Sequence, residues 1–250
     1  MRNAFVLNWE DVVAPISLLH QRTGLQASRQ ALAHAQLVLA GDAYLQQALV
    51  AIEAQIVELL RTAATMGPTF VVTERSIKFM EATCALFFPR LALWLRHGGD
   101  AVSGMIGSGT SGVGGYSVHV LAAPRSTFAS EMEKAAWRVS LLQGVCRETV
   151  ARGRDASTQQ HVLRSAELGA LGLVHVSASE MDAFACVKAI DVAPFLLPKC
   201  VCVRGSSSSS LPASASPPSL EEFFAQLRTL QRYVVSAAAH PSAFSVNLNL

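Results

Sequence analysis

The feature that most limits the fold of this chain is a series of short apolar runs separated by longer stretches with helical periodicity. The runs are too short for buried helices, and they are apolar at consecutive positions, which is typical of strands buried on both faces of a parallel sheet. We expect these strands at 5–7, 70–72, 118–121, 173–176 and 200–203.

Helices are predicted between these runs. The clearest apolar stripe runs over 45–63, where apolar residues recur three and four positions apart, and Gly67-Pro68 stops it. Further helical patterns cover 131–150 and 180–190, and Ser219 begins a last helix with a capping box. Strands that alternate with helices in this way predict an α/β protein. We expect an open, doubly wound (Rossmann-like) parallel sheet of about five strands with helices on both faces.

The spacing of the first two strands and the composition define the fold further. Only helices fit between Trp9 and Phe70, so no large cap domain is expected. The chain is 51% apolar and only 15% charged, which excludes intrinsic disorder for most of it. The chain has 20 Lys and Arg residues and 18 Asp and Glu residues, so it has no large excess of positive charge with which to bind nucleic acid.

No membrane span or secretion signal is expected. The most apolar stretch, 84–95, contains Pro89 and Arg90 and is shorter than the roughly 18 residues that a spanning helix requires. The chain begins without a signal-peptide pattern. We therefore expect a cytoplasmic protein with a single domain over 1–250.

Two segments and the cysteines call for separate interpretation. The segment 98–115 holds eight of the 16 glycines but lacks the Lys-Ser/Thr ending of a phosphate-binding loop, and 204–219 is rich in Ser and Pro. We expect both to be flexible insertions. The five cysteines have no zinc-type spacing, so buried free thiols are predicted; they are Cys84, Cys146, Cys186, Cys200 and Cys202.

Chemistry in an open parallel sheet is expected just after the strands, because ligands bind beyond the carboxyl ends of parallel strands. The segments that follow the first four runs are 8–12, 73–76, 122–126 and 177–180. They contain hydroxyl, arginine and acidic side chains that suit an oxyanion pocket. Three of the hydroxyl residues equally suit helix N-caps, namely Thr73, Ser126 and Ser179.

These segments resemble, in order and spacing, the motifs of the haloacid dehalogenase (HAD) superfamily. The resemblance is to the HAD-like proteins of plants and protists that begin Asp-Trp-Asp-Asp-Thr-Leu-Leu-Pro. That opening reads Asn8-Trp9-Glu10-Asp11-Val12-Val13-Ala14-Pro15 here. The second motif, Ile-Val-Thr-Asn, is similar to Val71-Val72-Thr73-Glu74.

The later motifs extend the resemblance over nearly the whole chain. The segment 122–128 resembles Ser-Ala-Arg-Ser-Thr-Tyr, and Trp137-Arg138 stands where the family has Trp-Lys. The segment 176–179, followed by Asp182, corresponds to Ile-Gly-Asp-Ser. The final helix, from Pro218 to Leu227, is similar to the family's closing Pro-Ser-x-Glu helix.

The departures from the family pattern concern catalysis. The resemblance implies that Asn8 stands in place of the aspartate nucleophile, and a carboxamide cannot form the acyl phosphate. Glu10 replaces the general acid/base with a longer carboxyl side chain, and Ala178 replaces an aspartate that helps to hold Mg²⁺. The phosphate-binding positions are better kept, with the hydroxyl of Thr73, the charge of Arg138 and, as a substitute cation one turn earlier, Lys134.

The expected function is a catalytically inactive HAD-like protein, a pseudophosphatase, that acts as a binding or structural subunit. It would have no cofactor, would bind an anion or phosphate weakly, and would take a protein partner. The alternative is a Mg²⁺-dependent phosphatase, a phosphoric-ester hydrolase, in which Glu10 activates water and Asp11 and Asp182 supply metal ligands. The aromatic residues of the last helix, and those at 87, 88 and 94, suit either partner contacts or the core, and their helical spacing favours the core.

Overall fold

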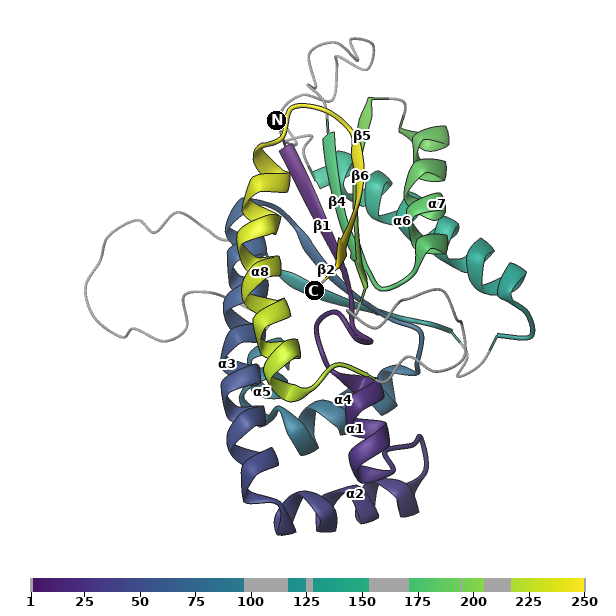
Figure 1. The fold of residues 1–250 in the computed structure, drawn as a ribbon. Coiled ribbons are helices and arrows are strands. Elements are labelled where there is room, and N and C mark those ends of the chain that lie inside the picture. Colours follow the sequence, from purple (N-terminus) through teal and green to yellow (C-terminus); the bar gives the residue numbers. More distant parts are fainter. Residues whose placement is uncertain are drawn as a thin grey trace.

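The computed structural model describes residues 2–96, 117–124, 128–152, 171–193, 195–204 and 217–249. Its centre is a parallel sheet with the strand order β3-β2-β1-β4-β5-β6 (Figure 1). The strands are β1 (Arg2–Asn8), β2 (Thr69–Thr73), β3 (Val118–Ala122), β4 (Leu171–Ser177), β5 (Leu196–Arg204) and β6 (Phe244–Asn249). The doubly wound parallel sheet is confirmed, with six strands where about five were expected.

The central strands are buried on both sides, as their continuous apolar sequences predict. Every residue of β2 and β4 is buried, and so are the last five residues of β1. β1 pairs with β2 on one side and with β4 on the other, so that Asn8 lies beside Val72 and Leu7 lies beside Val176. The carboxyl ends of these three strands therefore meet at one edge of the sheet.

Nine helical segments connect or flank the strands within the described residues. They are α1 (Ile16–Thr23), α2 (Arg29–Gly41), α3 (Ala43–Met66), α4 (Ile77–Phe87), α5 (Pro89–Arg96), α6 (Glu131–Arg152), α7 (Glu180–Lys188), the 3₁₀ helix η1 (Ala189–Val192) and α8 (Leu220–Ala239). α3 ends at Gly67 as predicted, and the capping box of Ser219 and Glu222 begins α8. None of the described helices combines the length and apolar character needed to cross a membrane.

The helices form a layer on each face of the sheet (Figure 1). On one face, α3 and α8 pack together and cover the larger core, to which Phe5 and Leu7 of β1 point. On the other face, α6 and α7 cover a smaller core with Ala4 and Val6. Because side chains alternate along a strand, Asn8 follows Ala4 and Val6 and faces α6 and α7.

The connection from β1 to β2 contains only α1, α2 and α3, so the expected lack of a large cap domain is confirmed. All five cysteines are buried free thiols, as predicted. The aromatic residues of α4, α5 and α8 that were weighed as partner contacts belong to the core or pack against it. The predicted insertion 98–115 and most of 204–219, namely 205–216, lie outside the described residues.

A buried lysine joins β5 to the end of α8. Lys199 is fully buried, and its Nζ donates hydrogen bonds to the carbonyl oxygens of Ala237 (2.8 Å) and Ala238 (3.1 Å). The last carbonyl groups of a helix lack partners within the helix and carry partial negative charge. The ammonium group therefore satisfies the C-terminus of α8 directly before the chain turns into β6.

Candidate functional site

The candidate site lies where the strand order changes direction. From β1 the chain proceeds outward to β2 and β3, and later crosses back to β4 on the other side of β1. In open α/β sheets such a switch point opens a crevice beyond the carboxyl ends of the strands. Asn8, Thr73 and Ser177 are the last residues of the three strands that meet there.

Asn8 is bound by the protein at both ends of its carboxamide. Its Nδ2 donates to Oδ2 of Asp182 on α7 at 2.7 Å, and its Oδ1 accepts from Nη1 of Arg138 on α6 at 2.9 Å. Asn8 is 4% exposed and Asp182 is 2% exposed. An amide suits this place, since it can donate to the buried carboxylate and accept from the guanidinium at the same time.

Arg138 is the centre of the site and is itself only 3% exposed. Besides Asn8, its Nη2 donates to Oε1 of Glu74 at 2.7 Å, and its Nε lies 3.2 Å from Oδ1 of Asp182. Its guanidinium also lies over the ring of Trp137, 5.1 Å from the centroid. Two carboxylates thus compensate one buried cation, and we call Asn8, Glu74, Arg138 and Asp182 the Arg138 network.

Glu74 extends this network to the surface through Lys134. Nζ of Lys134 lies 2.8 Å from Oε2 of Glu74, and both side chains are about one quarter exposed. Burial raises the pKa of Glu74, but the hydrogen bonds from Lys134 and Arg138 outweigh it and hold the pKa below its ordinary value. The carboxyl is therefore ionised at neutral pH. Sequence reasoning gave Glu74 no role, although an acid directly after a buried strand was a usable signal.

Glu10 and Thr73 form a second pair next to the network. The Thr73 hydroxyl donates to one Glu10 carboxyl oxygen, and the Glu74 N–H donates to the other at 3.3 Å. Burial raises the pKa of Glu10 above its ordinary value in spite of these hydrogen bonds. The N-cap interpretation is wrong for Thr73, because Ser76 caps α4, and holds for Ser179, which caps α7.

The three positions considered for a metal do not form one group. The Asp11 carboxylate accepts from the backbone N–H and the hydroxyl of Ser17 at the start of α1. Asp182 is bound to Asn8 and Arg138, and Ala178 is an exposed residue between β4 and Ser179. Within the described part of the chain, no three His, Cys, Asp or Glu side chains lie together as metal ligands would.

His175 is a buried polar residue of β4, on the face of the sheet that α6 and α7 cover. The sequence analysis gave it no role. It is 1% exposed, and neither ring nitrogen has a hydrogen-bond partner among the described residues. Burial lowers its pKa to about 4, and the charge of Arg138 adds to this effect while that of Asp182 opposes it. The ring is therefore neutral at pH 7. The only signal was a polar residue within the apolar run 173–176.

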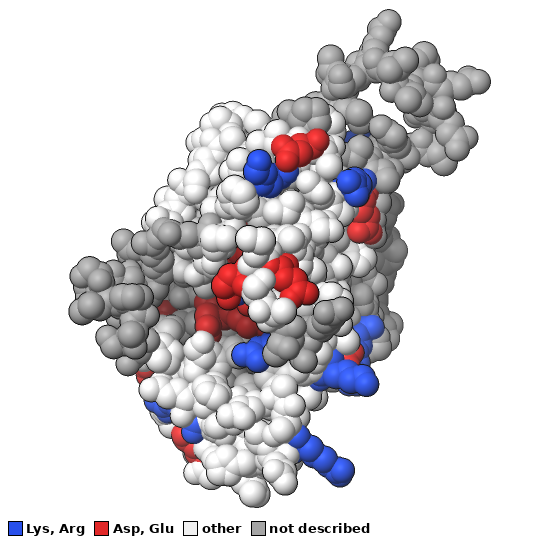
Figure 2. Space-filling model, turned by 90° about the vertical axis from the view of Figure 1, so that its right-hand side faces the viewer, with Lys and Arg blue, Asp and Glu red and all other residues white. Residues whose placement is uncertain are grey.

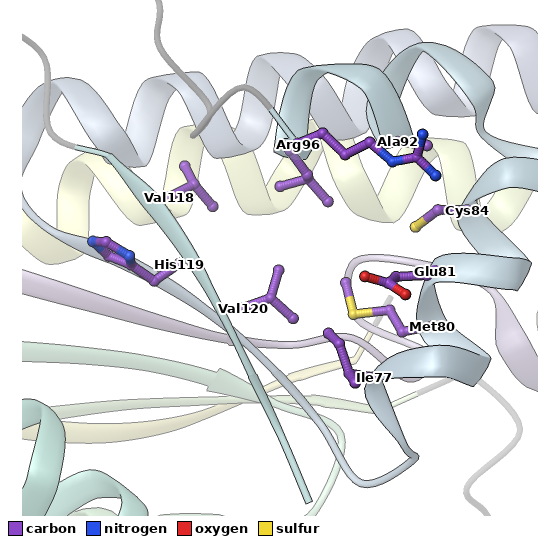
Figure 3. Close-up of a pocket in the computed structure, with 10 residues that line it drawn as sticks. Ile77, Met80, Glu81, Cys84, Ala92, Arg96, Val118, His119 and Val120 are labelled. Carbon is purple, nitrogen blue, oxygen red and sulfur yellow. The ribbon is translucent and has the colours of Figure 1, made fainter.

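Figure 2 shows the face that carries α6 and α7, on which uncharged residues predominate and Asp and Glu side chains gather near a central hollow. A cavity of about 350 Å³ lies between α4, α5 and β3, with Glu81 and Arg96 among largely apolar side chains (Figure 3). This cavity contains none of the candidate site residues, but one of the five buried cysteines, Cys84, lines it.

Comparison with protein-family models, with curated proteins and with solved structures found no match to this chain.

Proposed function

We propose that this protein is a catalytically inactive HAD-like protein that acts as a binding or structural subunit. The observation that carries the proposal is the state of Asn8. At the place where a nucleophilic carboxylate would stand, both polar atoms of a carboxamide are bonded to buried neighbours. The amide nitrogen lone pair is delocalised, and neither atom is free to attack a phosphorus atom.

Asp182 gives a physical reason for asparagine at this position. A carboxylate at position 8 would bring a second negative oxygen to within about 2.7 Å of the buried Asp182 carboxylate. Two buried like charges at this distance cannot both stay ionised. The carboxamide removes that repulsion by offering an N–H donor, and it removes the nucleophile at the same time.

Arg138 occupies the position between the acceptor oxygens that a metal ion would need. Oxygen atoms of Asn8, Glu74 and Asp182 all face its guanidinium at 2.7 to 3.2 Å. Mg²⁺ prefers such hard oxygen ligands but demands an octahedral arrangement of them. Because these oxygens already surround a fixed organic cation, the residues as arranged do not fit a Mg²⁺ ion.

The charge balance of the site does not favour the weak phosphate binding that the resemblance implies. The two cations, Arg138 and Lys134, are matched by Glu74 and Asp182, and Glu10 adds a third carboxyl group. The Thr73 hydroxyl is engaged with Glu10. A phosphate would have to displace these internal partners, which makes phosphate binding at this site unfavourable.

One observation favours the alternative of a hydrolase. Burial raises the pKa of Glu10 above its ordinary value, and this is the direction of shift that favours a general acid or base. Of the two metal ligands expected for such a reaction, Asp182 is engaged by Arg138 and Asp11 by Ser17, so no metal-dependent step follows from this arrangement.

A turnover assay separates the two functions. We expect the wild-type protein with Mg²⁺ and p-nitrophenyl phosphate to release no more phosphate than buffer does, and Glu10→Gln to give the same result. Magnesium-dependent turnover that Glu10→Gln abolishes would overturn the proposal. Lys78→Gln, at an exposed position of α4 outside the Arg138 network, serves as the matched control for preparation artefacts.

The resemblance itself is tested by building back the metal ligands. Asn8→Asp and Ala178→Asp restore the two missing carboxylates, and Arg138→Met removes the internal cation. We expect Mg²⁺ to raise the melting temperature of this triple variant more than that of the double variant without Ala178→Asp. An equal response of the two variants would contradict the alignment of Ala178 with the metal position.

A further inference from the structure

The strand β6 leaves one side of the sheet open. It pairs with β5 in parallel, with Val246 beside Val201 and Leu248 beside Val203. Among the described residues no strand pairs with its other side, and Figure 1 shows it at the side of the sheet that faces the viewer. An edge strand of this kind offers unpaired N–H and C=O groups to another strand.

This edge lacks the usual protection against pairing. Natural edge strands carry charged residues, proline or bulges that keep other strands away. The sequence of β6 is Phe-Ser-Val-Asn-Leu-Asn, which contains no charge and no proline. It is six residues long, which is an ordinary length for a strand that pairs on both sides.

The two faces of β6 differ in polarity. Phe244, Val246 and Leu248 pack against the core beneath α8 but are only partly buried. Ser245 and Asn247 lie on the opposite face and are exposed. A neighbouring strand at this edge would cover more of the three apolar side chains, provided that its own apolar residues lie on the same face.

We propose that β6 pairs in antiparallel orientation with β6 of a second copy of this chain. The twofold axis passes beside Val246, so that Val246 faces its own copy, Phe244 lies opposite Leu248, and Ser245 lies opposite Asn247. Residues directly opposite in an antiparallel pair point to the same face of the sheet. In this register apolar residues meet apolar ones on the α8 face and polar residues meet polar ones on the other.

A second copy fits this edge because the pattern is symmetric. From 244 to 248 the residues alternate apolar, polar, apolar, polar, apolar, and the order is the same when read backwards. An antiparallel twofold interface requires this self-complementarity, since each residue meets the symmetry-related partner of another. The proposal goes beyond the proposed function and uses none of the site residues.

The test uses charges placed across the axis. Ser245→Lys with Asn247→Lys brings lysine side chains opposite each other twice in the dimer, and Ser245→Glu with Asn247→Glu does the same with glutamates. Both positions are exposed, so both variants should fold, which circular dichroism verifies. We expect the wild type to be a dimer by sedimentation equilibrium, and each variant to dissociate at least about tenfold more readily.

Two further samples identify the register and the partner. An equimolar mixture of the Lys and Glu variants should form a heterodimer, and Ser245→Lys with Asn247→Glu, which pairs opposite charges across the axis, should stay a homodimer. A wild type that is monomeric at about 100 µM, or a dimer that both single-sign variants leave intact, would overturn the proposal. So would a mixture that stays monomeric.

Discussion

Replacing the buried Arg138 by methionine should destabilise this protein more than replacing a partly exposed cation does. The guanidinium meets two buried groups, Asn8 and Asp182, and the partly exposed Glu74. Without it, the Asn8 N–H is the one side-chain donor left to the Asp182 carboxylate among the described residues, and Oδ1 of Asn8 loses its Arg138 donor. Breaking a buried ion pair by removing one partner costs about 3–5 kcal/mol.

Urea unfolding followed by circular dichroism at pH 7 measures this loss. With a slope of about 2–3 kcal/mol per molar urea, Arg138→Met should lower the midpoint by about 1–2 M. Lys134→Met is the matched control, because Lys134 sits on the same helix and pairs with Glu74 where both are partly exposed. Such a surface pair contributes at most about 1 kcal/mol.

A double variant separates the orphaned charge from lost packing. Asp182→Asn removes the charge that Arg138→Met leaves unpaired, and the two amides at positions 8 and 182 can still bond. We expect the pair of substitutions to be less destabilising than the sum of the single ones by about 2–3 kcal/mol. If Arg138→Met costs no more than Lys134→Met, or if the two substitutions are additive, the Arg138 network does not stabilise the site.

Four other substitutions have defined outcomes. The pKa of His175 is about 4 in the folded protein, which is below the ordinary value of 6.5. The unfolded chain therefore binds the His175 proton more readily, and the free energy of unfolding falls by about 3 kcal/mol as the pH drops from 6.5 to 4. His175→Leu should lose this part of the acid sensitivity, which urea unfolding at pH 7 and at pH 4.5 measures. If the midpoint of the variant falls between these pH values as much as that of the wild type, the assignment to His175 is wrong. Thr73→Val removes a donor from the Glu10 carboxylate, which raises the Glu10 pKa further. The resulting loss of about 1–3 kcal/mol should be largest at alkaline pH, where Glu10 is ionised, and shrink as the pH falls and Glu10 becomes protonated. A loss that does not vary with pH would count against that assignment. A Cβ on Gly67 would lie 2.0 Å from the Asn3 carbonyl oxygen, whereas one on Gly144 would meet nothing within 4 Å. Gly67→Ala should therefore lower the melting temperature, and Gly144→Ala, within α6, should raise stability by about 0.5–1 kcal/mol; the reverse order would refute the packing argument.

The strands of the inner sheet could be predicted because burial on both faces leaves a continuous apolar signature in the sequence. β6 was missed for the opposite reason. It is an edge strand with one exposed face, so Phe244, Val246 and Leu248 alternate with polar residues and form no continuous run. A search for two-residue alternation would have found it.

The site could be predicted in part. Parallel strands bring their carboxyl ends together, which predicted that Asn8 and Thr73 would be neighbours. The inward direction of Arg138 was also readable, because Leu142 and Val145 lie one and two turns later on the same buried side of α6. The contact of Arg138 with three acceptors at once could not be predicted. It depends on where α6 lies over the sheet, and that position results from packing between distant parts of the chain.

The Arg138 network has a consequence for the time course of folding. Its members lie at positions 8, 74, 138 and 182, so it closes only after four distant parts of the chain are assembled. Withdrawing these charges from water before all partners are present is unfavourable, so we expect the contacts to form after the rate-limiting step. Arg138→Met should then speed unfolding and leave the refolding rate nearly unchanged. We therefore expect the Arg138 network to lengthen the lifetime of the folded chain.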